Sequence, residues 1–62
     1  MGDYCYYSFQ QLEGHNPTAH ILTNDFDEAQ DEAELDHLDH PERAHGVIDT
    51  QTREVVYRLE AE

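Results

Sequence analysis

The chain has 62 residues, and its 15 acidic residues against three arginines and no lysine give a formal net charge of -12. So negative a chain is repelled by nucleic acid and by anionic membranes, which argues against both as direct ligands and predicts a cationic protein partner. The length predicts one small domain over residues 1–62, near the lower limit for folding without disulfides or metal.

The first predicted strand covers residues 3–11, where aromatic side chains are frequent and the two faces alternate. Alternation places Cys5, Tyr7 and Phe9 on one face, expected to be the core, and Tyr4 and Tyr6 on the other.

As the lone cysteine, Cys5 cannot form an internal disulfide. With no apolar run typical of a signal peptide or membrane span, the chain is expected to be cytoplasmic.

Turn-forming residues over 13–17, which include Gly14 and Pro17, separate this strand from a second one predicted over residues 18–23. The two strands therefore predict an antiparallel hairpin.

An acidic helix is predicted next, within residues 24–40, a segment that holds eight acidic residues and no basic ones apart from histidine. The spacing of Phe26, Ala29, Ala33 and His37 is typical of a helix with one buried stripe. The start is expected to be capped by Thr23, Asn24 or Asp25, and the end to fall at His40-Pro41. Six acids are expected on the solvent-exposed arc: Asp27, Glu28, Asp31, Glu32, Glu34 and Asp36.

A second hairpin is predicted from residues 45–49 and 54–59, joined by a turn in which Arg53 is expected to adopt a left-handed backbone. Val55, Tyr57 and Leu59 are expected on the core face. The order ββαββ predicts an α+β fold, in which a four-stranded antiparallel sheet is covered on one face by the acidic amphipathic helix. The opposite, open face would then expose Tyr4, Tyr6 and Val56, a candidate contact surface for a partner or for a second copy.

Catalysis is not expected. General acid–base chemistry needs a pocket that separates the pKa values of its carboxyl groups, and so thin a domain has little room for one. Cys5 has no basic neighbour in sequence to stabilise a thiolate, and Ser8 has no evident partners. We predict a non-enzyme without a cofactor. His37, His40 and His45 leave metal binding open as an alternative, although structural zinc sites usually contain cysteine.

The acidic segment decides the leading functional hypothesis. Its charges recur about every 3 Å along a helix axis, close to the roughly 3.4 Å per phosphate of one DNA strand. The sequence therefore favours a protein-binding module that mimics nucleic acid and occupies a basic groove of a nucleic-acid-handling protein. In charge and size alone it resembles phage inhibitors of restriction, repair and CRISPR machinery. The contact residues would be the six helix acids, with Tyr4, Tyr6 and Val56 as secondary contacts.

Two interpretations of the same composition remain open beside this one. The absence of lysine can reflect a GC-rich genome, and the acids can be an adaptation to a salt-rich cytoplasm, in a small domain that pairs with a second copy through its open sheet face. They can also form a solvated face that only keeps the protein in solution. Low hydrophobicity with high charge is also typical of disorder, but the strand patterns at both ends argue for a folded domain.

Overall fold

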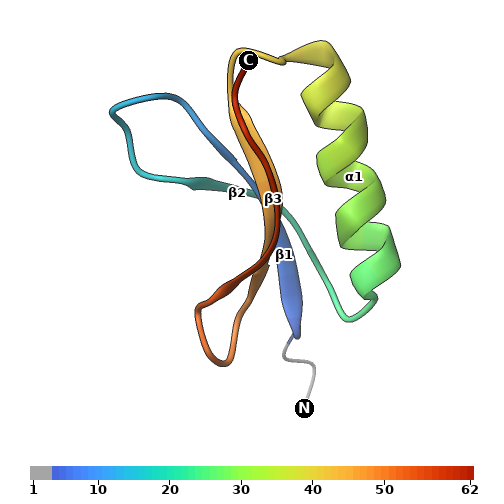
Figure 1. The fold of residues 1–62 in the computed structure, drawn as a ribbon. Helices are drawn as coiled ribbons and strands as arrows, with labels where there is room; N and C mark the ends of the chain where they lie inside the picture. Colours follow the sequence, from blue (N-terminus) through green and yellow to red (C-terminus); the bar gives the residue numbers. More distant parts are fainter. Residues whose placement is uncertain (1–3) are drawn as a thin grey trace.

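The computed structural model describes residues 4–62, and it contains the predicted elements in the predicted order. Four strands form one antiparallel sheet in the order β2-β1-β3-β4, and the single helix lies against one side of it (Figure 1). The α+β prediction is confirmed. The elements are β1 (Tyr6–Gln11), β2 (Thr18–Thr23), α1 (Phe26–Asp39), β3 (Ala44–Asp49) and β4 (Val55–Leu59).

Both ends of α1 follow from local sequence. Asp25 caps the start, since its side chain accepts a hydrogen bond of 3.0 Å from the backbone N–H of Asp27. The helix ends at Asp39, and the backbone N–H of His40 closes the last turn on the Asp36 carbonyl before Pro41. Within residues 4–62 no helix has the length and apolar character needed to cross a membrane.

The helix packs mainly on the two central strands, β1 and β3, through small side chains. Ala29 and Ala33 are fully buried, as the helical spacing predicts, and they lie against the strands beside the fully buried Val47. Because alanines leave little bulk between the layers, the helix backbone can approach the sheet closely.

The face of β1 that α1 covers is not the one expected from the sequence. Tyr6 packs edge-to-face against Phe26 of α1, with ring centroids 5.4 Å apart, so Tyr6 and Ser8 face the helix and the prediction of Tyr6 on the open face is wrong. Phe9 is still buried, but on the opposite side of β1, where it lies over Gly46 of β3. A Cβ at position 46 would lie 2.8 Å from the Phe9 ring, so the missing side chain makes room for the phenylalanine.

A second face assignment is also wrong, because the second hairpin contains a bulge. Val47 pairs with Tyr57 but Ile48 pairs with Val55, so Val55 and Tyr57 lie on opposite faces instead of sharing the core. The hairpin turn matches expectation: the Asp49 side chain accepts hydrogen bonds from the following turn, and Arg53 has φ of +61°.

Candidate functional site

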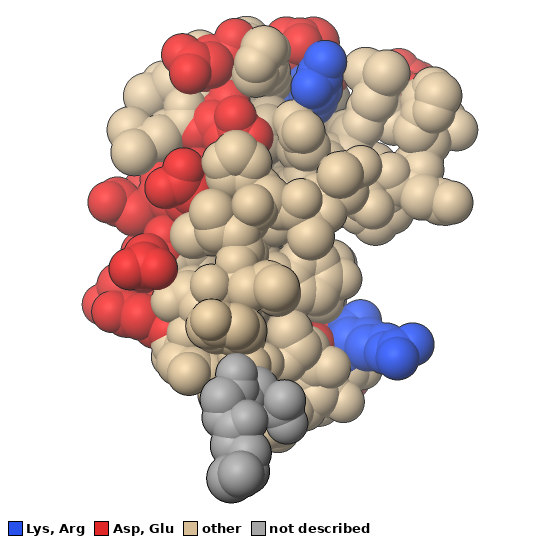
Figure 2. Space-filling model, turned by 180° about the vertical axis from the view of Figure 1, so that it is seen from behind, with Lys and Arg blue, Asp and Glu red and all other residues tan. Residues whose placement is uncertain are grey.

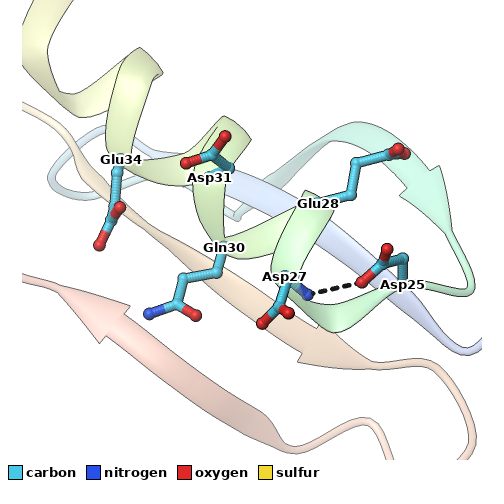
Figure 3. A pocket seen from close by; sticks show the side chains of 6 residues that line it. All are labelled: Asp25, Asp27, Glu28, Gln30, Asp31 and Glu34. Atoms are coloured by element: carbon cyan, nitrogen blue, oxygen red, sulfur yellow. Dashed lines mark hydrogen bonds between the residues drawn. The ribbon is translucent and has the colours of Figure 1, made fainter.

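Five acids of α1 are exposed, of which Asp39 lies at the end of the helix. We call the other four, in the first nine residues of α1, the acidic face: Asp27, Glu28, Asp31 and Glu34. With Asp25 and Gln30 they line a shallow hollow along the first half of the helix (Figure 3). Figure 2 shows acidic side chains gathered along one side of the molecule, next to a broad surface with few charges. On the face shown, the helix therefore contributes a band of negative charge along one side.

The spacing of the acidic face is that of a regular helix. Asp27 and Glu34 are seven residues apart, or about 10 Å along the axis, which gives the four acids an average interval of about 3.5 Å. The arginine ion pairs shown for residues 4–62 join Arg43 to Glu42 and Arg58 to Glu60, so none neutralises an acid of α1. Within residues 4–62, the acidic face therefore has no arginine partner.

Not all six predicted acids belong to this face. Asp36 turns toward the sheet: its side chain is only 17% exposed, and its Oδ2 lies 3.3 Å from Nε2 of the buried His45. Glu32 is half-buried and pairs with His20 of β2 at 3.3 Å. Both were expected on the exposed arc, but they lie at its edge, where the sheet offers imidazole partners.

Glu34 keeps its place on the acidic face while accepting a hydrogen bond of 2.8 Å from the hydroxyl of Tyr57 in β4. This hydrogen bond raises the pKa of Tyr57, because the negative carboxylate disfavours a negative phenolate beside it. The contact links one acid of the face to β4.

The three secondary contact residues do not form a single surface with the acids. Tyr4 and Val56 are about half exposed, as predicted, whereas Tyr6 is partly covered by Phe26. Tyr6 contributes to the packing of the helix start. Whether Tyr4 and Val56 contact a partner stays a prediction.

Two residues on the outward side of α1 were missed by the sequence analysis. Leu35 is 56% exposed and Leu38 is 78% exposed, so the helix turns its two leucines to solvent and its two alanines to the core. The signal was present in the sequence, since both leucines fall outside the stripe defined by Phe26, Ala29 and Ala33.

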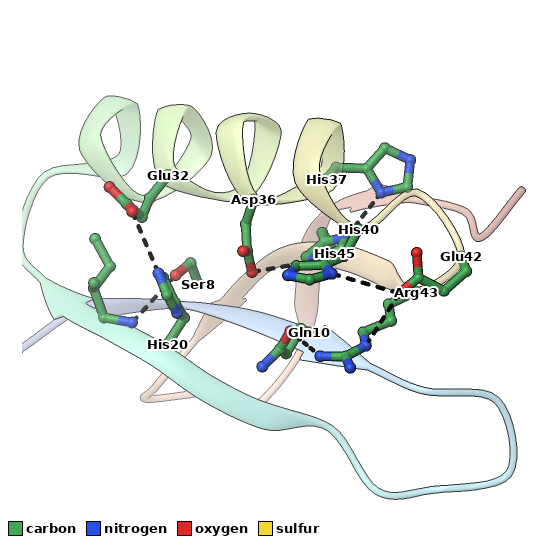
Figure 4. A network of polar contacts seen from close by, with 11 residues as sticks. Ser8, Gln10, His20, Glu32, Asp36, His37, His40, Glu42, Arg43 and His45 are labelled. Atoms are coloured by element: carbon green, nitrogen blue, oxygen red, sulfur yellow. Dashed lines mark hydrogen bonds and ion pairs between the residues drawn. The ribbon is translucent and has the colours of Figure 1, made fainter.

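Three histidines, His37, His40 and His45, lie near the C-terminal end of the helix, and the first and last of them are in contact (Figure 4). Nδ1 of His37 lies 2.8 Å from Nδ1 of the fully buried His45, so one ring donates a hydrogen bond to the other. On its other side, His45 Nε2 is close to Asp36 Oδ2 but out of line for a hydrogen bond. His45 is thus a buried imidazole with only one good hydrogen bond.

Burial lowers the pKa of His45 below 6.5, and the negative charge of Asp36 opposes this effect only in part. The neutral ring is therefore the form that the fold accommodates. His40 stands apart, half exposed and 3.5 Å from Glu42. Among residues 4–62 no three histidine, cysteine or acidic side chains are arranged to hold a metal ion. The close Nδ1 pair is instead joined by one hydrogen bond between the two rings.

Comparison with protein-family models, with curated proteins and with solved structures finds no match for the chain.

Proposed function

We propose that the protein is a binding module that docks its acidic face onto a basic groove of a nucleic-acid-handling protein and so competes with nucleic acid for that groove. The supporting observation is the set of four uncompensated carboxylates on one rigid helix. Their axial interval of about 3.5 Å matches the roughly 3.4 Å per phosphate along one DNA strand. A groove built for phosphates meets a similar density of negative charge.

Electrostatic cost supports a functional role for these acids. Asp27 and Asp31 are four residues apart, as are Glu28 and Glu32, and such like-charge pairs destabilise a helix by about 0.2–0.5 kcal/mol each. Basic residues at some of these positions would remove that cost. A cationic partner would remove it on binding, and it would also be attracted at long range with a rate that falls as salt is added.

The test uses immobilised protein to retain partners from extracts of its native host, with a matched variant as the second bait. The triple variant Asp27→Asn, Glu28→Gln, Asp31→Asn removes charge without changing side-chain size. We expect proteins held by the wild type in dilute buffer to be released by salt, to be lost by the variant, and to bind nucleic acid. Partners that are held equally by both baits would overturn the proposal.

A second candidate, a homodimer through the open sheet face, is favoured by one row of apolar side chains. Leu22, Tyr7, Ile48 and Val55 are successive cross-strand partners on the side away from α1, and Leu22 and Val55 are each about half exposed. Two copies joined by this row would keep their acidic faces apart. Sedimentation over a wide range of concentrations tests it: a dimer that Leu22→Glu dissociates supports this candidate, and a monomer at every concentration contradicts it.

A further inference from the structure

The outward side of α1 presents an apolar pair as well as charge. Leu35 and Leu38 are three residues apart, so they are neighbours on successive turns of the helix. At 78% exposure, Leu38 is the most exposed large hydrophobic side chain among residues 4–62. Single exposed leucines are common on protein surfaces, but two adjacent ones on the side of a helix that faces away from the core form a continuous apolar strip.

Acids border this strip. Asp31 is four residues before Leu35, Asp39 is four residues after Leu35, and Glu34 is four residues before Leu38. A purely cationic surface would satisfy these carboxylates and leave both leucines against polar groups. The complementary partner surface has lysines or arginines at its rim and an apolar floor between them.

We propose that Leu35 and Leu38 form the apolar anchor of the acidic face, and that the occupant of this face is a basic groove with an apolar or aromatic floor. This inference rests on the proposed function and narrows it. Grooves for single-stranded nucleic acid have this composition, because cationic side chains follow the phosphates while aromatic side chains stack on the bases. Surfaces that hold duplex DNA chiefly by its phosphates lack such a floor. The carboxylates of α1 then occupy the positions that phosphates take in the groove, and the two leucines occupy those of the bases.

The test uses two synthetic peptides of equal length and equal lysine content as probes. In the first, glycine and serine fill the remaining positions; in the second, tryptophan and leucine do. Fluorescence anisotropy gives the affinity of each peptide for the wild type, for Leu35→Gln with Leu38→Gln, and for the control Leu12→Gln. Leu12 is a suitable control because it is 43% exposed and lies between β1 and β2, outside α1 and outside the apolar row of the open sheet face.

We expect the apolar probe to bind the wild type at least about tenfold more tightly than the polar one, as the burial of two leucines implies. The double leucine variant should lose this preference while still binding the polar probe, and Leu12→Gln should keep it. Equal affinity of the wild type for the two probes would overturn the inference and leave the proposed function standing. If neither probe binds, or if Asp27→Asn, Glu28→Gln, Asp31→Asn binds the polar probe as well as the wild type does, the proposed function itself is contradicted. Circular dichroism of each variant confirms that it is folded.

Discussion

Replacing Asp31 by Asn should stabilise the protein, because Asp31 is surrounded by like charges. It lies four residues after Asp27, three after Glu28 and three before Glu34, and all four side chains face solvent. Each such contact costs about 0.2–0.5 kcal/mol. The helix dipole favours negative charge only in the first turn. Asp31 lies beyond that turn, so the dipole does not offset the repulsion. We therefore expect the free energy of unfolding to rise by about 1 kcal/mol in dilute buffer, or roughly 4–8 °C in Tm.

Thermal and urea unfolding followed by circular dichroism measure this change, with Glu13→Gln as the matched control. Glu13 is an exposed acid in the loop between β1 and β2, so its substitution removes one charge without altering the helix. At about 1 M KCl the gain from Asp31→Asn should shrink, because the screening length falls to about 3 Å. Equal stabilisation by both variants, or a gain that persists at high salt, would refute the claim that the acids of α1 repel one another.

Three further predictions follow from the same structure. The fold favours the neutral form of the buried His45, whose pKa lies below 6.5, so the unfolded chain takes up a proton more readily than the folded one. The free energy of unfolding should therefore fall as the pH drops below about 6.5. Urea unfolding on both sides of that pH checks this, and a loss no steeper in the wild type than in His45→Gln would contradict it. Gly46→Ala should destabilise the sheet by about 1–3 kcal/mol, because its Cβ would meet the Tyr57 carbonyl and the Phe9 ring; a variant with unchanged Tm would contradict the packing described. The wild type should be folded in dilute buffer without added KCl, which circular dichroism tests; folding only at molar salt would favour solvent adaptation as the origin of the acids.

Local sequence signals were sufficient for the fold. Alternating strands, two turn segments and the helix limits at Asp25 and His40 each depend on residues close together in the chain, and each prediction is confirmed. Even the left-handed Arg53 followed from its place in the turn.

Which face of each strand the helix covers could not be found in this way. That choice depends on long-range packing: Phe9 fits over Gly46, which is distant in sequence, and a bulge opposite Val47 changes the facing of Val55. Alternation placed Cys5, Tyr7 and Phe9 on the expected core face, whereas α1 covers the side of β1 that carries Ser8.

The candidate site was predicted as far as it depends on helical periodicity. Asp27, Glu28, Asp31 and Glu34 are exposed as expected, but Asp36 and Glu32 lie at the edge of the helix, where their direction is set by His45 and His20. These histidines belong to strands, so the helical spacing of α1 alone does not predict their contacts with Asp36 and Glu32. A side chain at the edge of the helix points to the sheet when the sheet provides a partner for it, and to solvent when it does not.

The most direct test of the account is competition for the groove of a retained partner. Labelled single-stranded nucleic acid is first bound to that partner, and the protein is then added while fluorescence anisotropy reports the bound fraction. We predict that the wild type displaces the nucleic acid completely and that Asp27→Asn, Glu28→Gln, Asp31→Asn does so only at far higher concentration. A ternary complex, in which partner, nucleic acid and protein remain bound together at saturation, would contradict the account.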